Sequence, residues 1–439
     1  MVGSASTTFL AFAMPVSMFG VLWPDARADF DRSLGALGVV SLVYGLARMA
    51  TSGAGRRTTG RVGIGPAFVG ALVALVVADL ALAAAPGWTT FLAGVAAIGV
   101  VSGLLDSVGA GVVATLGDIG DAGLIHGAYG VGATVGPLVV AVVPGWRWSL
   151  VIAALAAVVA TVAARRVGDR WPVPPGSDDD TTCDDMTFDD TTFEGAATDG
   201  TAPAGPGTDG SGTDGTGTGG ARVDPSELDV ATAAETASAG RRLDRTGGPR
   251  STGRPPAFPT TVSLTVFFAF VACEVTLGSW LFTYLTEARS IGDGVAAVGV
   301  SGFWAGTTVG RLGLVSARVR DVLDRAGMVA SALAAVGLLL VVLLAPGGSV
   351  VVASTLVGLS LGPLVPTLSA RTAGRVGARH AQQVSGWQLL AANVGAISVP
   401  FLTGRAVDSV GPGVVVPITL AVFAVGIPSL VVAARLAPA

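Results

Sequence analysis

Residues 177–200 read SDDDTTCDDMTFDDTTFEGAATDG and lie in the least hydrophobic part of the 439-residue chain, which runs from 165 to 259. Gly, Ser, Thr, Pro and Asp dominate this part, and the triplet Thr-Asp-Gly recurs in it at 198–200, 208–210 and 213–215. Because such a composition buries too little apolar surface to offset the entropy lost on ordering, we predict a disordered acidic linker over 165–259. The linker separates two apolar halves, 1–164 and 260–439.

The composition of the whole chain is typical of a membrane protein with many spans. Hydrophobic residues make up 51% of the sequence and charged residues 13%, and the mean hydropathy is +0.69. A soluble globular protein is less apolar and more charged. The linker holds 17 acidic residues against 9 arginines, whereas the two halves together hold 13 against 17. The acidic character therefore belongs to the linker, and nothing indicates nucleic-acid binding.

Apolar segments of roughly twenty residues recur through both halves, which is the length that crosses the hydrocarbon as a helix. Pro- and Gly-containing breakers separate many of them, among them Trp23-Pro24-Asp25 after the first. We predict twelve spans, six in each half, near 5–23, 34–52, 63–85, 89–116, 123–143, 147–164, 261–285, 295–315, 327–345, 349–369, 383–404 and 412–434.

Arginine is unevenly distributed among the predicted loops. If the N-terminus is inside, the loops after spans two, eight and ten face the cytoplasm and carry eleven arginines, against five in the outer loops. Short loops rich in Arg stay on the cytoplasmic side. We therefore expect a multi-pass protein of the cytoplasmic membrane, with both termini and the linker inside.

The two halves repeat each other at a nearly constant offset. Pairs separated by 258 or 259 residues include Phe9 and Phe267, Gly99 and Gly358, and Gly103 and Gly362. Parallel repeats about an axis normal to the membrane are a known way to build alternating access. The sequence thus predicts an all-α integral membrane fold with twelve transmembrane helices, arranged as two six-helix bundles related by a parallel pseudo-twofold repeat.

Two groups of six spans, a long inner loop and basic loops after spans two and eight resemble the major facilitator superfamily, over nearly the whole chain except the linker. The superfamily's signature after span two is a glycine, an aspartate and then Gly-Arg. Gly53, Gly60 and Arg61 fit this signature, whereas Arg57 stands where the aspartate belongs. The resemblance implies a cytoplasmic gating role for Arg48, Gly60, Arg61 and Arg311.

Three stretches are similar to the fucose-permease-like branch of sugar–proton symporters within that superfamily. They are HGAYGVGATVGP at 126–137, Glu274-x-x-x-Gly278-Ser-Trp280, and Phe303-Trp304-x-Gly306. The similarity implies a sugar-like solute and coupling to a proton.

Three acidic residues lie inside predicted spans, where an ionisable group costs about 2.5–3.5 kcal/mol on insertion scales. Asp106 lies in span four, in the helix where the fucose-permease-like branch carries a coupling acid, and Glu274 lies in span seven. We predict that these two carboxylates bind the coupling proton, or Na⁺. The alternative is a structural ion pair with Arg48 or Arg311 at the inner helix ends. For Asp79, toward the outer end of span three, we expect a structural role.

The solute is expected to bind near the midplane between the bundles, among polar and aromatic side chains. Amide groups there would hydrogen-bond hydroxyl groups, and an indole ring would stack on a sugar. The alternatives are packing for the aromatic rings and interhelical hydrogen bonds for the amides. The predicted binding residues are Tyr129, Thr134, Trp304, Trp387, Gln388 and Asn393.

The sequence contains no phosphate-binding loop and no nucleophile elbow, and its two histidines and two cysteines cannot build a typical metal site. We therefore expect no enzyme activity, no cofactor and no metal, and a monomer whose partners are the solute, the coupling ion and the lipid bilayer.

Three functions remain open. The first is a secondary active transporter that moves a sugar-like solute with H⁺ or Na⁺. The second is a proton-coupled drug or metabolite exporter, whose span-five motif is half present at Gly136-Pro137. The third is a non-transporting membrane sensor that binds a partner through its linker, which the low complexity of the linker disfavours.

Overall fold

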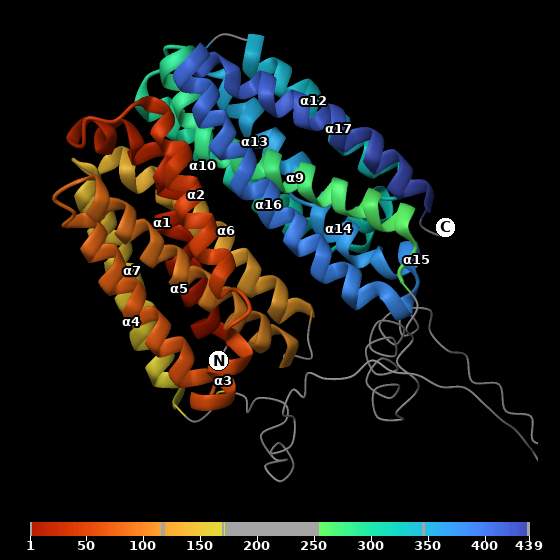
Figure 1. Ribbon diagram of the computed structural model, residues 1–439, viewed down its shortest axis with the longest axis horizontal. Helices are drawn as coiled ribbons and strands as arrows, with labels where there is room; N and C mark the ends of the chain where they lie inside the picture. The colour runs from red at the N-terminus through yellow and green to blue at the C-terminus, as the bar shows by residue number, and fades with distance from the viewer. Residues whose placement is uncertain (1, 116–118, 169–170, 172–253, 345–346, 437–439) are drawn as a thin grey trace, which may run out of the picture. The chain divides into compact units, whose positions relative to one another are not determined.

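The computed structural model describes residues 2–115, 119–168, 171, 254–344 and 347–436. Most of the linker predicted over 165–259 therefore lies outside the described residues. Within the described residues all regular structure is helical and no strand occurs (Figure 1). The helices on the two sides of the linker belong to one compact unit.

The helices of the first half coincide with the six spans predicted there. The short helix η1 (Leu34–Ala36) leads directly into α2, and α3 lies in the loop after span two. The helices are α1 (Val2–Asp29), α2 (Leu37–Thr51), α3 (Gly55–Val62), α4 (Ile64–Ala83), α5 (Trp88–Thr115), α6 (Ile119–Val142) and α7 (Trp146–Val167).

The second half has the same plan, with the tenth span divided at Gly362-Pro363 and with short helices in two of its loops. The helices are α9 (Ala257–Thr283), its π-helical extension η3 (Tyr284–Ala288), α10 (Asp293–Gly313), α11 (Ala317–Val322), α12 (Arg325–Leu344), α13 (Ser349–Leu361), α14 (Leu364–Ala370), α15 (Thr372–Val376), α16 (Ala378–Val410), η4 (Pro412–Val414) and α17 (Val415–Leu436).

All twelve predicted spans are thus helical. Ten helical segments among the described residues are long and apolar enough to cross a membrane by themselves. The other two spans are α6, which contains the shorter apolar helix Gly127–Val142, and α10, which is polar at both ends. The prediction of a twelve-helix membrane protein is confirmed.

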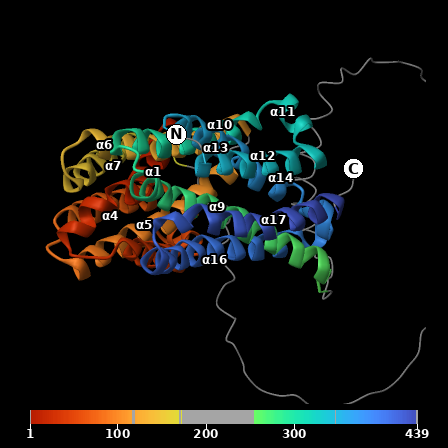
Figure 2. The same ribbon diagram turned by 90° about the horizontal axis from the view of Figure 1, so that it is seen from above.

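Helix pairing repeats between the halves, as the sequence offset predicts. In the first half α1 packs against α6, α2 against α5 and α4 against α7; in the second, α9 packs against α16, α10 against α13 and α12 against α17. These are the same three pairs when spans one to six are matched with spans seven to twelve. Figure 1 shows the red-to-yellow helices and the green-to-blue helices as two groups, which overlap in the view of Figure 2.

Glycines at repeated positions hold one of these pairs together in both halves. A Cβ added at Gly103 would overlap the backbone carbonyl of Arg48, and a Cβ added at Gly362 would overlap that of Thr307. The two contacts are related by the 259-residue offset. Small residues allow helix backbones in a membrane to approach this closely.

One predicted breaker is not a break. Helix α1 continues through Trp23-Pro24-Asp25 and ends at Asp29. Trp23 is fully buried, and its indole Nε1 donates a hydrogen bond to the carbonyl of Leu34, 2.8 Å away. Pro24 has no N–H and cannot donate a backbone hydrogen bond within the helix. The packing of Trp23 compensates for this loss, so the helix continues to Asp29.

Candidate functional site

The two bundles meet along α2 and α16, along α6 and α10, and along α1 and α9. Polar contacts join them at the end of the molecule that carries the α1–α2 connection. The carboxylate of Asp408 at the end of α16 accepts hydrogen bonds from the Ser33 hydroxyl (2.9 Å) and the Gly35 backbone N–H (2.7 Å). Arg27 and Glu287 form an ion pair of 3.6 Å at the same end. We call the Asp408–Ser33–Gly35 contact the α16–η1 latch.

An arginine and an acid form an ion pair between two helices of the first bundle, with the arginine in the last turn of its helix. Arg48 on α2 approaches Asp106 on α5, because α2 and α5 are held in close contact by Gly99 and Gly103. The Nε and Nη2 atoms of Arg48 lie 2.7 and 2.6 Å from the Oδ2 atom of Asp106. Both side chains are about one-third exposed, at 37% and 28%.

A second pair lies in the other bundle. The Nη2 atom of Arg311 on α10 is 2.5 Å from the Oε1 atom of Glu274 on α9. The Glu274 side chain is only 10% exposed, so its charge is largely removed from solvent. Its guanidinium partner retains a buried Nε with no hydrogen-bond acceptor among the described residues. A buried carboxylate of this kind needs a paired cation or a proton.

A cavity of about 110 Å³ lies between the bundles and is lined from both of them. Its polar lining comes from Ser41, Tyr44, Arg48, Tyr129, Ser279 and Asn393, with Trp304 on one wall. The Trp304 ring packs against Gly278, where a Cβ would overlap it, and its buried Nε1 donates to no acceptor in the described part of the chain. The cavity thus combines hydroxyl, amide and guanidinium groups with an indole.

Tyr129 connects the cavity to both charge pairs. It lines the cavity together with Tyr44 and Arg48, and its helix packs against α10 next to Arg311, where Gly127 and Gly130 approach Leu312 and Thr308. Its ring packs edge-on against Phe12, with centroids 5.3 Å apart. We refer to the four residues of the two acid–arginine pairs, Arg48, Asp106, Arg311 and Glu274, as the charged cluster.

The structure brings together three of the six residues predicted to bind the solute: Tyr129, Trp304 and Asn393 all line the cavity. Thr134 does not line it, and its hydroxyl donates to the Gly130 carbonyl within α6. Trp387 is 39% exposed on α16 and is also absent from the lining.

Gln388 lies in a buried hydrogen-bond network inside the second bundle. Its Nε2 donates to the Ser263 hydroxyl (3.0 Å), and its Oε1 accepts from Thr372 (3.1 Å). Arg375 joins the network through Ser263 (3.1 Å) and the Leu368 carbonyl (2.7 Å). Burial and the nearby Arg371 lower the pKa of Arg375 to about 10, so it stays charged at neutral pH. This is the interhelical bonding that the sequence left open for Gln388.

The residues of the predicted gating loop separate into two groups. Arg48 and Arg311 bind Asp106 and Glu274, whereas Gly60 and Arg61 are exposed on α3. Helix α3 is fixed at its start, where the Gly55 N–H donates to the Ser107 hydroxyl of α5 (3.0 Å). Asp79 is fully buried on α4, with neither carboxylate oxygen hydrogen-bonded among the described residues.

Sequence reasoning missed Tyr44 and Asp408. Tyr44 precedes Arg48 by one helical turn, so the i,i+4 spacing that places it on the same face of α2 was available as a signal. Asp408 gave no such signal, because its partners lie more than 370 residues away in sequence.

Comparison with known proteins places this geometry among transporters. The family model described as Major Facilitator Superfamily matches residues 5–400. No curated protein matches the sequence. The chain is similar to the crystal structure of a peptide transporter POT mutant, with a TM-score of 0.68 and 15% identity over 99% of this chain and 94% of that chain. The same mutant in complex with alafosfalin gives a TM-score of 0.65 at 14% identity with the same coverage. At such identities the likeness shows the fold alone.

Proposed function

The chain belongs to the major facilitator superfamily, and on this premise we propose that it is a secondary active transporter for a small, polar, sugar-like solute, coupled to H⁺ or Na⁺. The observation that carries the proposal is the cavity between the bundles with an acid–arginine pair beside it in each bundle. In the proposed mechanism the two bundles rock about this cavity and expose it alternately to the two sides of the membrane.

Asp106 and Glu274 are the proposed coupling residues. Each carboxylate is neutralised by one arginine in the structure, and a bound proton or cation would replace that arginine as its partner. Removing the partner of a charge in a low-dielectric site is costly, by about 3–5 kcal/mol. Ion binding at the acid and the arrangement of the helices that carry Arg48 and Arg311 are therefore linked.

The hydroxyl, amide and indole groups of the cavity support a polyhydroxylated solute. Tyr44, Tyr129 and Asn393 supply donors and acceptors, and Trp304 supplies a flat ring with an unused N–H. The volume of about 110 Å³ is below the roughly 300–1,000 Å³ of drug-sized pockets. The cavity thus favours a small solute over the large substrates of a drug exporter.

In this proposal the protein is a monomer in the cytoplasmic membrane with both termini inside. The α16–η1 latch would then lie at the outer end, so that the structure represents a state closed to the outside. The arginine distribution of the loops supports this orientation.

Transport by reconstituted protein tests the proposal. Full-length protein in liposomes is expected to exchange one or more labelled monosaccharides in counterflow, and to accumulate them when an inward H⁺ or Na⁺ gradient is imposed. A gradient that instead drives solute out of the vesicles in exchange for the ion would support the exporter.

Substitution of the two acids separates coupling from binding. Asp106→Asn and Glu274→Gln are expected to retain counterflow and lose accumulation, because the neutral amides cannot exchange an ion. Asp293→Asn, at the exposed start of α10, is the matched control and should behave as wild type. Accumulation that persists in both Asp106→Asn and Glu274→Gln would remove these acids from the coupling mechanism.

A further inference from the structure

Each arginine of the charged cluster binds only one oxygen of its acid, Oδ2 of Asp106 or Oε1 of Glu274. We propose that the transported solute carries a carboxylate, and that Arg48 binds this carboxylate when Asp106 is protonated. The proposal rests on the proposed function and specifies its substrate class, namely a sugar acid or another polyhydroxy monocarboxylate.

The Arg48–Asp106 ion pair does not have the bidentate geometry of the strongest arginine–carboxylate pairs. The Nε and Nη2 atoms of Arg48 converge on Oδ2 alone, rather than meeting one carboxylate oxygen each. The strongest arginine–carboxylate pairs are bidentate, with two parallel N–H···O bonds. Arg48 also lines the cavity, whereas Asp106 does not, so the guanidinium is the charged group that a solute in the cavity would meet.

Charge balance links the proton to the solute. With both acids ionised, the cluster of Arg48, Asp106, Arg311 and Glu274 is neutral. Protonation of one acid leaves a single positive charge in this partly buried cluster, and a bound carboxylate restores neutrality. The proton and an anionic solute therefore promote each other's binding, whereas a neutral sugar gains nothing from the freed arginine.

Among the residues whose side chains the structure describes, Tyr44 and Tyr129 are the titratable groups that line the cavity together with Arg48. Asp79 is buried on α4, which packs against α5, and Cys273 is buried beside Glu274 on α9. The ionisable residues of α1, α16 and α17 lie near the ends of those helices.

The remaining lining matches the rest of such a solute. Ser41, Ser279 and Asn393 are hydrogen-bonding groups suited to hydroxyls, and the buried N–H of Trp304 has no acceptor of its own in the described structure. This unused donor in the cavity wall favours a solute with acceptor oxygens.

Transport assays on pairs of solutes test the proposal. Full-length protein in liposomes is offered D-galacturonate against D-galactose, and D-glucuronate against D-glucose. The acid of a pair is expected to exchange in counterflow and to bind about 10- to 100-fold more tightly than its neutral parent, which corresponds to one charge-assisted hydrogen-bonded contact. Its uptake should respond to an inward pH gradient but not to a K⁺ diffusion potential, because one H⁺ and one monoanion carry no net charge.

The alternative outcomes are distinct. If the neutral sugars are transported and the acids neither enter nor compete, the inference is overturned while the proposed function stands. Proton-driven uptake of an acid that rises with an inside-negative potential overturns the one-to-one charge balance. If no solute of either kind exchanges, the inference and the sugar-like substrate class both fall.

Substitutions of arginine identify the binding group. Arg48→Gln is expected to reduce the ratio of acid to neutral affinity to about one, and Arg48→Lys to retain part of it. This ratio does not depend on how much protein is folded, so a poorly expressed variant still gives an answer. Arg166→Gln, exposed near the end of α7, is the control that should leave the ratio unchanged. An unchanged ratio in Arg48→Gln would contradict the assignment.

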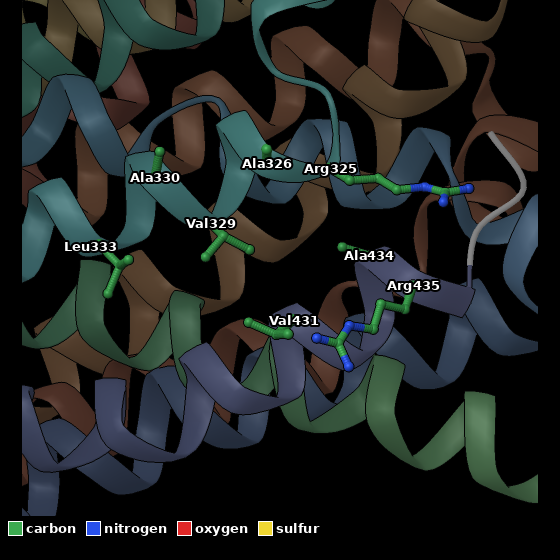
Figure 3. A pocket seen from close by; sticks show the side chains of 8 residues that line it. All are labelled: Arg325, Ala326, Val329, Ala330, Leu333, Val431, Ala434 and Arg435. Carbon is green, nitrogen blue, oxygen red and sulfur yellow. The ribbon is translucent and has the colours of Figure 1, made fainter.

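A second inference comes from a groove between helices α12 and α17 of the second bundle. A groove of about 400 Å³ lies between the start of α12 and the end of α17, with Arg325 and Arg435 both beside it (Figure 3). Small and branched apolar side chains form its walls, among them Ala330, Leu333, Val431 and Ala434. We infer that the groove binds an anionic phospholipid, with an acyl chain along the apolar walls and the phosphate on the guanidinium of Arg435, which points toward Val431, while Arg325 adds positive charge at the rim (Figure 3).

The charge and the position of the groove carry this inference. Arg325 is the first residue of α12 and Arg435 lies in the last turn of α17, so both stand where membrane helices end and headgroups begin. Arginine binds phosphate through two parallel hydrogen bonds. Basic pockets between transmembrane helices on the cytoplasmic side are suited to anionic lipid headgroups.

Native mass spectrometry and thermal unfolding of the detergent-solubilised full chain test this site. Phosphatidylglycerol is expected to remain bound and to raise the Tm, phosphatidylcholine to do neither, and the Arg325→Gln/Arg435→Gln double variant to lose both effects. Glycerol phosphate serves as the headgroup without acyl chains. An equal effect of glycerol phosphate, or an undiminished lipid effect in the double variant compared with Arg166→Gln, would overturn the inference.

Discussion

Gln388 and Asn393 lie five residues apart on α16 and have different surroundings. Gln388 is 1% exposed and bonded to Ser263 and Thr372, whereas Asn393 lines the cavity. Asn393→Ala is therefore expected to weaken the apparent affinity for the solute by about 5- to 10-fold, which corresponds to one hydrogen bond of about 1 kcal/mol. Concentration-dependent uptake in proteoliposomes measures this effect.

Gln388→Ala should have the opposite profile. It leaves buried partners unsatisfied, at a cost of about 1–3 kcal/mol, and so is expected to lower the Tm without changing the apparent affinity. If Gln388→Ala weakens solute affinity at unchanged Tm, the binding role predicted from the sequence is correct and the reading of the network is wrong.

These two amides also show what the sequence can decide at the scale of a residue. Five helical positions correspond to about 140° of rotation, so the sequence alone indicates that the two side chains point to different faces. Which of them faces the cavity depends on Ser263, a partner 125 residues away on another helix. Tyr129, Trp304 and Asn393 line one cavity, and their roles in solute binding stay predictions.

Asp79 gives a contrasting expectation for a buried acid. Its carboxylate is fully buried and has no hydrogen-bond partner in the described structure, and it is not among the residues that line the cavity. Asp79→Asn removes an ionisable group of the same shape, so proton-driven accumulation is expected to be unchanged and the Tm not lowered. Uncoupled transport in this variant would instead make Asp79 part of the coupling mechanism.

At the scale of the helix, the repeated glycines fix how closely α10 and α13 approach. Gly362→Ala places a methyl group against the Thr307 carbonyl and is expected to destabilise the protein by about 1–3 kcal/mol, the usual cost of overpacking. Thermal unfolding in detergent measures the loss. Gly337→Ala in α12 is the matched control, because no atom lies within 4 Å of its added Cβ. Equal Tm values for the two variants would show that the close contact is not needed.

Helix ends could be predicted where Pro and Gly interrupt the apolar sequence. They could not be predicted where tertiary packing determines whether a helix continues. The Pro and Gly residues at 86–87 and 144–145 separate helices as the sequence indicates. Pro24 does not, because Trp23 packs in the core and bonds to Leu34 of the next element. The tenth span was predicted as one segment, 349–369, and the structure divides it at Gly362-Pro363.

For the whole molecule, the internal repeat was the most informative part of the sequence. An offset of 259 residues predicted that contacts in one half recur in the other, and the Gly103–Arg48 and Gly362–Thr307 contacts do so. The charged cluster does not follow the repeat, because Arg48 binds an acid of α5 whereas Arg311 binds an acid of α9. Asymmetry of this kind arises from side chains rather than from the helix arrangement, and a repeat cannot predict it.

The α16–η1 latch is expected to stabilise the conformation in which the two bundles are closed at that end of the molecule. Asp408 accepts hydrogen bonds from the Ser33 hydroxyl and the Gly35 N–H at the start of the segment that leads into α2, where a negative charge is also stabilised by the helix dipole. Loss of this contact should favour the state in which the bundles separate at that end. Two hydrogen bonds to a carboxylate of about 1.5–3 kcal/mol each set the scale, so Asp408→Ala is expected to raise the open population about tenfold or more.

Accessibility of the cavity from each side measures this shift. Ser279→Cys provides a label site in the cavity, in a chain in which Cys183→Ser and Cys273→Ala remove the native thiols. In right-side-out vesicles a membrane-impermeant maleimide should react faster when Asp408→Ala is added, because the reagent then reaches the cavity through the loosened end. Ser409→Ala is the control, since that hydroxyl bonds only within its own helix. If Asp408→Ala speeds labelling only in inside-out vesicles, the latch lies at the cytoplasmic end and the proposed orientation is reversed. If labelling does not change from either side, the latch does not hold the bundles together.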